Sequence, residues 1–238
     1  MSRFHAREHE TGAPKHSAAG SKRTSRDTTD IRSALEIRSL HFRYETSEPT
    51  AAAVLRDLSL AAPDGAVTAI IGPNGAGKTT LINVALGWLR PQSGEVLVFS
   101  RALNAMTRRE TGQTISLVPQ DEHVPFEYSL LEYVLLGRAP YLATLAGPGP
   151  HDIARAFESL ERVGLADRYD KAITEVSGGE RQLAMLARAL CQEPRLLLMD
   201  EPTAHLDLTN KRRLVEIVSS LRRHGVSVVF STHDPEFA

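Results

Sequence analysis

Short apolar runs alternate along most of the chain with longer stretches in which apolar residues recur at helical spacing. The runs at residues 66–71, 196–199 and 226–231 are almost continuously apolar, as is typical of strands buried on both faces of a parallel sheet. Residues 80–89 and 181–190 have the spacing of helices. The alternation predicts an α/β fold with a mainly parallel core sheet.

The beginning of the folded part departs from this alternation. Residues 35–44 and 54–60 look like strands joined by a polar loop, and a turn is expected at Pro63-Asp64-Gly65. This order predicts an antiparallel β element in front of the parallel core.

The middle of the chain, roughly residues 129–168, has no strand pattern. It contains two helical patterns, at 130–136 and 153–163, on either side of the turn Gly147-Pro148-Gly149-Pro150. We expect a helical subdomain inserted at roughly residues 121–175.

Residues 1–32 are rich in Ser, Thr, Arg, Lys, His and Gly and have scarcely any large apolar residues. Such a segment cannot bury enough surface to offset the entropy of ordering it, so we expect a disordered tail followed by one domain over residues 33–238. Its positive charge suits anionic lipid or RNA, but a solvated tail is the simpler interpretation.

Composition narrows the class of protein. The length of 238 residues suits one large α/β domain, and 28 Lys and Arg against 29 Asp and Glu give no sign of a nucleic-acid partner. The single cysteine, Cys191, excludes an intramolecular disulfide, as suits a reducing compartment. The apolar runs are too short to cross a bilayer, so a link to a membrane must come through a partner.

Residues 72–79 read Gly-Pro-Asn-Gly-Ala-Gly-Lys-Thr, which fits G-x-x-x-x-G-K-[ST], a loop that wraps nucleotide phosphates. The loop lies between the expected strand at 66–71 and the expected helix at 80–89. Backbone amides and the helix dipole favour an anion there, so this context favours phosphate binding over a chance glycine-rich turn.

The loop residues have distinct roles. Gly72, Gly75 and Gly77 permit positive φ and close approach of a phosphate, Lys78 suits the β- and γ-phosphates, and the Thr79 hydroxyl suits Mg²⁺. The residues expected to contact the nucleotide are Gly72, Pro73, Asn74, Gly75, Ala76, Gly77, Lys78, Thr79 and Thr80.

The expected strand at 196–199 ends in two carboxylates, Asp200 and Glu201. The carboxyl end of a buried parallel strand opens at the ligand-binding edge of the sheet, beside the phosphate loop. We expect Asp200 to hold Mg²⁺ through water and Glu201 to act as general base on the attacking water.

A second glycine pair lies in Ser177-Gly178-Gly179-Glu180, before the expected helix at 181–190. Ser177 and Glu180 fit a capping box, and a simple capped helix explains both of them. It does not explain the two glycines, which weaken a helix start unless a ligand must approach the backbone. We expect a second phosphate contact there.

The phosphate loop, Ser-Gly-Gly-Glu and Leu-Leu-Leu-Met-Asp-Glu-Pro-Thr occur in this order at suitable separations. The chain closely resembles the ATPase subunit of ATP-binding cassette (ABC) transporters, which have a phosphate-loop NTPase fold, from about Leu35 to its last residue. It departs at Val176, where the family usually has Leu, and at Ala238, beyond which family members continue with a further strand and helix. If that part is missing, we expect lowered stability and weaker ATPase activity.

The resemblance implies further site residues. Tyr44 matches the aromatic that stacks on adenine, Gln120 the glutamine that reaches the metal and attacking water, and His233 the histidine that contacts the γ-phosphate. Otherwise Tyr44 is a strand-end tyrosine and Gln120 an ordinary polar residue. The resemblance thus assigns catalysis to Glu201, His233, Gln120 and Lys78, the metal to Thr79, Gln120 and Asp200, and a dimer-interface loop to residues 204–207, which include His205.

The resemblance also implies a mechanism. Two copies pack head to tail, and each ATP, with Mg²⁺, lies between the phosphate loop of one copy and Ser177, Gly178 and Gly179 of the other. Closure of this homodimer drives transmembrane permease subunits at the cytoplasmic face of the membrane, and a solute-binding protein delivers cargo to that permease.

Residues 131–141 resemble the V-x-x-G-R-x-P region of importers for iron–siderophore complexes, haem and cobalamin, so we expect an ATPase of that importer type, with Arg138 acting in coupling. Two alternatives stay open. One is a soluble ABC ATPase that meets no membrane, such as an iron–sulfur cluster assembly factor. The other is a non-catalytic nucleotide-binding regulator, against which Glu201 argues.

Overall fold

A computed structural model describes residues 32–45, 52–204 and 206–235 of the protein. The expected tail lies outside the described residues except for Arg32, and so does His205.

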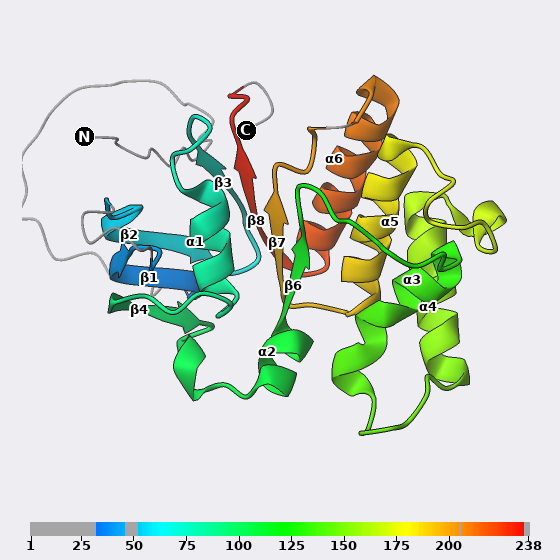
Figure 1. The fold of residues 1–238 in the computed structure, drawn as a ribbon, viewed down its shortest axis with the longest axis horizontal. Helices are drawn as coiled ribbons and strands as arrows, with labels where there is room; N and C mark the ends of the chain where they lie inside the picture. Colours follow the sequence, from blue (N-terminus) through cyan, green and yellow to red (C-terminus); the bar gives the residue numbers. More distant parts are fainter. Residues whose placement is uncertain (1–31, 46–51, 205, 236–238) are drawn as a thin grey trace, which may run out of the picture.

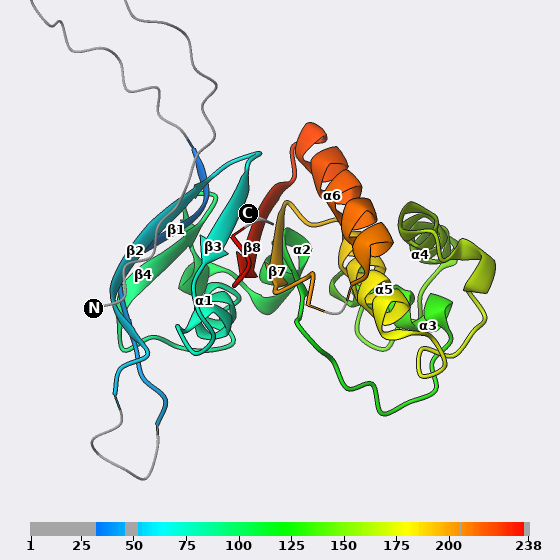
Figure 2. The same ribbon diagram turned by 90° about the horizontal axis from the view of Figure 1, so that it is seen from above.

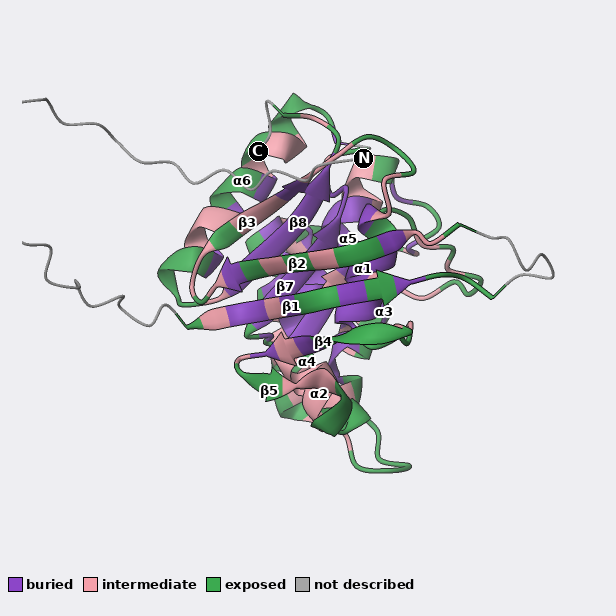
Figure 3. Ribbon diagram, turned by 90° about the vertical axis from the view of Figure 1, so that its left-hand side faces the viewer, coloured by how far each residue is buried: buried purple, intermediate pink, exposed green. Residues whose placement is uncertain are grey.

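The first sheet is antiparallel. It contains β1 (Ser33–Phe42), β2 (Leu55–Pro63), β4 (Ser93–Val98) and the short β5 (Arg101–Ala102), in the order β2-β1-β4-β5. β1 pairs with β2 and β4, and buried and exposed residues alternate along parts of it, so one face covers the core and the other faces solvent (Figure 3). The antiparallel element predicted from the sequence is confirmed.

The second sheet is parallel. It contains β3 (Val67–Ile71), β8 (Ser227–Thr232), β7 (Leu196–Asp200) and β6 (Ile115–Val118), in the order β3-β8-β7-β6. Every residue of β7 is buried, as expected of a central strand covered on both faces. Because the strands are parallel, their carboxyl ends meet at one edge of the sheet. This confirms the predicted parallel core.

Helices cover both faces of the parallel sheet (Figures 1 and 2). α1 (Lys78–Ala85) lies between the two sheets, while α5 (Gly178–Cys191) and α6 (Leu208–Arg223) lie on the other side. Successive side chains of β7 point to opposite faces of the sheet. Leu196 and Leu198 pack in the cluster with α1. Leu197 and Met199 pack in the cluster with α5 and α6.

The remaining helical elements lie at the periphery. α2 (Arg108–Thr114) precedes β6 and follows the 3₁₀ turn η1 (Leu103–Ala105). α3 (Leu130–Leu135), η2 (Leu136–Tyr141), α4 (Pro150–Val163) and η3 (Ala166–Arg168) pack beyond α5 (Figure 2).

The bounds of β1 and α1 differ from the sequence prediction. β1 ends at Phe42, so Tyr44 lies just beyond the strand. α1 begins at Lys78 and ends at Ala85, whereas the pattern predicted a helix over residues 80–89. The helix stops early because Gly87 has a positive φ of 75°. Within the described part of the chain, no helix has both the length and the apolar character needed to cross a membrane.

Candidate functional site

The glycine-rich loop joins β3 to α1 at the carboxyl edge of the parallel sheet. Gly75 and Gly77 have positive φ values of 78° and 95°. A Cβ at Gly77 would lie 3.1 Å from side-chain carbons of both Val54 and Leu55, so this position also needs glycine for space. The expectation of a positive φ at Gly72 was wrong. Its N–H donates to the carbonyl of Thr232 at 3.2 Å and extends the β3–β8 pairing.

Lys78, the first residue of α1, has a buried side chain in the loop. Its Nζ donates to the carbonyl oxygens of Gly72 at 2.8 Å and Pro73 at 3.1 Å. Nζ also lies 3.1 Å from Oε1 of Glu201, which directly follows β7. The ammonium group therefore connects the loop after β3 with the residue that follows β7.

Glu201 lies between two basic partners. Its side chain is 10% exposed, and Oε2 lies 2.9 Å from Nδ1 of His233, which follows β8. Burial raises the pKa of Glu201, but the hydrogen bonds and charges of Lys78 and His233 outweigh this effect and bring that pKa below its ordinary value. Glu201 is thus a carboxylate at neutral pH, as a general base must be.

Asp200 ends β7 and is buried beside Ser231 of β8. The Ser231 hydroxyl donates to Oδ1 of Asp200 and accepts the backbone N–H of Glu201 at 3.0 Å. The carboxylate of Asp200 thus lies behind Glu201, and Asp200 is not among the residues that line the cavity described next.

A cavity of about 270 Å³ opens over the loop. It is bordered by loop residues, by the start of α1 and by side chains from the ends of β6 and β7. The lining residues are Val54, Asn74, Gly75, Gly77, Lys78, Thr79, Thr80, Gln120 and Glu201. The structure therefore brings most of the predicted loop residues together with Gln120 and Glu201, around the positive end of a helix.

Tyr44 lies next to this cavity. Its hydroxyl oxygen lies 3.1 Å from Oγ1 of Thr80, a lining residue, and its ring meets Phe42 edge-on with 4.9 Å between centroids. Tyr44 as a whole is 44% exposed, which leaves surface for stacking on a planar ligand.

The second glycine pair is not brought to the cavity. Ser177 is the N-cap of α5, and its N–H donates to Oε2 of Glu180 at 2.9 Å, which completes the predicted capping box. Arg168 of η3 makes an ion pair with the same carboxylate. Ser177 and Gly178 are exposed, and a Cβ at Gly178 would have open space, so packing within one chain does not require glycine at this position.

The donor atoms at the cavity fit Mg²⁺ with bound phosphates. Thr79 offers a hydroxyl, Gln120 an amide oxygen and Glu201 a carboxylate, all of them hard oxygen ligands. Asp200, the last residue of β7, lies outside the lining. No group of three or more His, Cys, Asp and Glu side chains that could hold a metal occurs among the described residues. A magnesium ion here would therefore need phosphate oxygens and water to complete its coordination.

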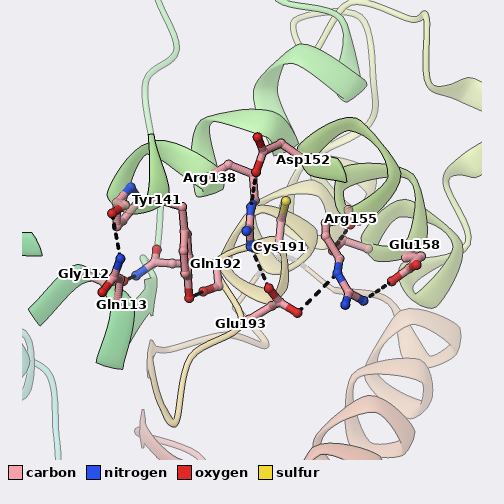
Figure 4. A network of polar contacts seen from close by, with 12 residues as sticks. Gly112, Gln113, Arg138, Tyr141, Asp152, Arg155, Glu158, Cys191, Gln192 and Glu193 are labelled. Carbon is pink, nitrogen blue, oxygen red and sulfur yellow. Dashed lines mark hydrogen bonds and ion pairs between the residues drawn. The ribbon is translucent and has the colours of Figure 1, made fainter. Parts of the chain in front are cut away.

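The structure places Arg138 in the interior, which leaves its predicted role in coupling untested, and it reveals one residue that the sequence reasoning missed. The side chain of Arg138 in η2 is 3% exposed and lies within a network of polar contacts, drawn in Figure 4. It bonds to Asp152 at 2.9 Å, Glu193 at 2.8 Å and the Cys191 carbonyl at 2.9 Å. Ser231 was missed, although its position just before Thr232-His233, at the end of an expected strand, is a usable signal.

Known proteins resemble the chain over most of its length. The profile of the ABC transporter family matches residues 55–204. A Helicobacter pylori protein described as "Probable iron chelatin transport ATP-binding protein" is 36% identical over 84% of this chain and 78% of its own length. A molybdate import ATP-binding protein of Haemophilus influenzae is 35% identical over 85% of this chain and 74% of its own.

Solved structures agree with this assignment. A bacterial ABC transporter cassette, solved as a dimer, superposes with a TM-score of 0.76 at 28% identity, over 86% of this chain and 90% of that one. The matched segment contains the phosphate loop, Gln120, the Ser-Gly-Gly-Glu helix start and the Asp-Glu strand end. The chain therefore belongs to the ABC transporter family and carries its ATPase domain.

Proposed function

We propose that this chain is the ATP-hydrolysing subunit of a membrane importer, with Glu201 as general base. The observation that carries the proposal is the cavity in which the phosphate loop, Lys78, Gln120 and an ionised Glu201 converge. Each group comes from the carboxyl end of a parallel strand or from the loop after it, so the sheet fixes their mutual geometry.

ATP would enter with its phosphates against the loop amides and the N-terminus of α1, and with its adenine on Tyr44. The phosphates would draw Lys78 from Glu201, because a triphosphate offers a stronger negative charge than one carboxylate. Glu201 would then be free to accept a proton from the attacking water. His233 would leave Glu201 and contact the γ-phosphate instead.

Mg²⁺ fits the same site through Thr79 and Gln120, and through water on Asp200. When bound, it would supply positive charge that neutralises the charge of the phosphate oxygens. Loop amides and Lys78 add stabilisation aimed at the transferred phosphoryl group, and they are already oriented before reaction.

We infer a head-to-tail homodimer in which Ser177, Gly178 and Gly179 of one copy close over the nucleotide of the other. The exposure of Ser177 and Gly178, their absence from the cavity lining and the open space at Gly178 support the inference, as does the relative solved as a dimer. ATP would then act as a bridge whose hydrolysis opens the pair and moves the permease.

We propose an iron chelate, haem or cobalamin as the cargo. Residues 131–141 and the iron chelatin relative support this class, while the molybdate relative is almost equally similar. Permease subunits would bind this chain at the cytoplasmic face of the membrane. Uptake of radiolabelled ferric siderophore, haem, cobalamin and molybdate into vesicles carrying the chain and its permease would test the cargo; uptake of molybdate alone would contradict it.

The Glu201→Gln variant tests the catalytic proposal. Loss of the base should lower ATP turnover by about 10²–10⁴-fold while ATP binding persists, and light scattering should detect a dimer trapped by ATP. Glu193→Gln is the matched control, because Glu193 is a carboxylate on the turn after α5, away from the cavity. Normal turnover in Glu201→Gln would contradict the assignment of the base.

A further inference from the structure

A single hydroxyl in the core contacts both proposed active-site carboxylate residues. Ser231 of β8 is completely buried and lies opposite Asp200 in the register of the parallel strands. Its Oγ donates to Oδ1 of Asp200, and it accepts the backbone N–H of Glu201 at 3.0 Å. The hydroxyl therefore uses its one hydrogen on the first residue and a lone pair on the second.

The bond to Glu201 holds an unusual backbone. Glu201 has a φ of 44°, in the left-handed region that residues with a side chain rarely adopt. This turn directs its carboxylate toward Lys78 and His233 instead of continuing the alternation of β7. A buried N–H without a partner is costly, so the hydroxyl helps to keep Glu201 in this conformation.

The bond to Asp200 fixes a side chain behind the cavity. Asp200 is 4% exposed, and among the described residues its carboxylate accepts a side-chain hydrogen bond from Ser231 alone. Asp200 is proposed to hold Mg²⁺ through a water molecule. The orientation of its carboxylate would therefore decide where that water molecule can bind.

We propose that Ser231 is a positioning residue for the ATPase reaction, which aligns Asp200 toward a magnesium-bound water and Glu201 toward the attacking water. The inference rests on the proposed roles of Asp200 and Glu201. It predicts that loss of this one hydroxyl raises the Mg²⁺ concentration required for activity and lowers turnover, although Ser231 would contact neither substrate nor metal.

The same strand contains a matched control. Ser227, at the other end of β8, is 1% exposed, donates to Oδ1 of Asp64 at 3.0 Å and accepts the N–H of Gly65 at 2.9 Å. It thus repeats the bonding pattern of Ser231, one aspartate and one backbone amide, away from the cavity. The alanine variants at both positions remove comparable bonds from comparable burial.

The experiment compares Ser231→Ala with Ser227→Ala. Thermal unfolding measures the structural cost of each, and ATPase assays across Mg²⁺ concentration measure function. We expect Ser231→Ala to lower kcat and to raise the Mg²⁺ concentration for half-maximal activity by about 10–100-fold, with KM for ATP changed little. Ser227→Ala should lower the melting temperature similarly and keep wild-type kinetics. Identical kinetics in the two variants would overturn the inference.

Equilibrium binding supplies a readout that does not depend on turnover. A fluorescent ATP analogue is titrated with Mg²⁺ and with EDTA. Ser231→Ala should bind it normally in EDTA and lose most of the gain in affinity that Mg²⁺ gives the wild type. An unreduced gain would contradict the role in metal placement.

A second substitution at this position tests the inference if Ser231→Ala does not fold. Ser231→Cys keeps the side-chain volume but has a weaker donor and acceptor, so it should show the same shifts to a smaller degree. A folded cysteine variant with wild-type kcat and Mg²⁺ requirement would overturn the inference. If the wild type lacks Mg²⁺-dependent hydrolysis, or Glu201→Gln retains it, the proposed function itself fails. An inactive Glu201→Gln variant with wild-type-like Ser231→Ala would refute only the positioning role.

Discussion

Lys78 and Arg138 are the two buried basic side chains of the described chain, and they serve opposite purposes. Lys78 lies 3.1 Å from Glu201 and faces the cavity over the phosphate loop. Arg138 lies 2.9 Å from Asp152 and 2.8 Å from Glu193, and its guanidinium stacks over Tyr141 at 4.0 Å from the ring centroid (Figure 4). Both side chains form ion pairs in the interior, but of the two only Lys78 borders a cavity that an anion can enter.

The partners of each cation explain the difference. Arg138 joins η2 to α4 and to the turn after α5, and the neighbouring Gly137 has no room for a Cβ, which would lie 2.3 Å from the Arg188 carbonyl. Every donor bond of Arg138 described above therefore goes to a packed part of the fold. Lys78 instead bonds carbonyls of a loop whose amides suit phosphate. The surroundings of a buried ion pair decide whether it is a fixed support or an exchangeable contact.

The largest effect should come from Arg138→Ala. Removal of one partner of a buried ion pair costs about 3–5 kcal/mol, because the half-buried Asp152 loses its cation and the space of the buried guanidinium is left empty. Denaturant unfolding measures this loss in free energy, and the ATP affinity of the folded fraction should stay unchanged. The stability of Arg138→Ala must therefore be measured before any loss of transport in this variant can be assigned to coupling.

Arg155→Ala is the control for this prediction. Arg155 pairs with Glu158 and Glu193 at the surface, so its loss should cost far less. Equal destabilisation by the two variants would contradict the description of Arg138 as the central support of this region.

A smaller effect is expected for Lys78→Ala. Charged hydrogen bonds contribute about 1.5–3 kcal/mol, so the affinity for ATP should fall by about 10–100-fold. Calorimetric titration measures the change, with Lys171→Ala, an exposed lysine, as control. If Lys78→Ala binds ATP as the wild type does, Lys78 is a structural residue like Arg138 and the contrast between them disappears.

The smallest effect concerns pH. The pKa of Asp152 is lowered, first by the N–H of Gly149 and then by Arg138, and the pKa of Glu201 is lowered because Lys78 and His233 outweigh its burial. Their ordinary values are about 4, so both contributions to stability are complete above that pH and are lost as pH falls through the lower folded values. In unfolding measured from neutral to acidic pH, Glu201→Gln should lose stability less steeply than the wild type. Parallel curves would show that Glu201 gains no stability from its partners.

Local chemistry made much of the fold predictable. The continuous apolar run of β7, the capping box of Ser177 and Glu180, and the glycine loop before α1 depend on neighbouring residues, and all three occur where the sequence placed them. The end of α1 was less predictable, because one glycine at residue 87 ended an otherwise helical pattern.

By itself, the sequence determined the α/β class, the phosphate loop with its lysine, and the carboxylates at the end of β7, because each follows from short-range periodicity or spacing. Only the tertiary structure decided which side chain meets which carboxylate. Lys78 meets Glu201, Ser231 meets Asp200, and Arg138 meets Asp152, across strand pairings and helix contacts that no local pattern encodes. Contacts between residues far apart in sequence depend on strand order and packing, and these emerge only when the whole chain buries its apolar surface.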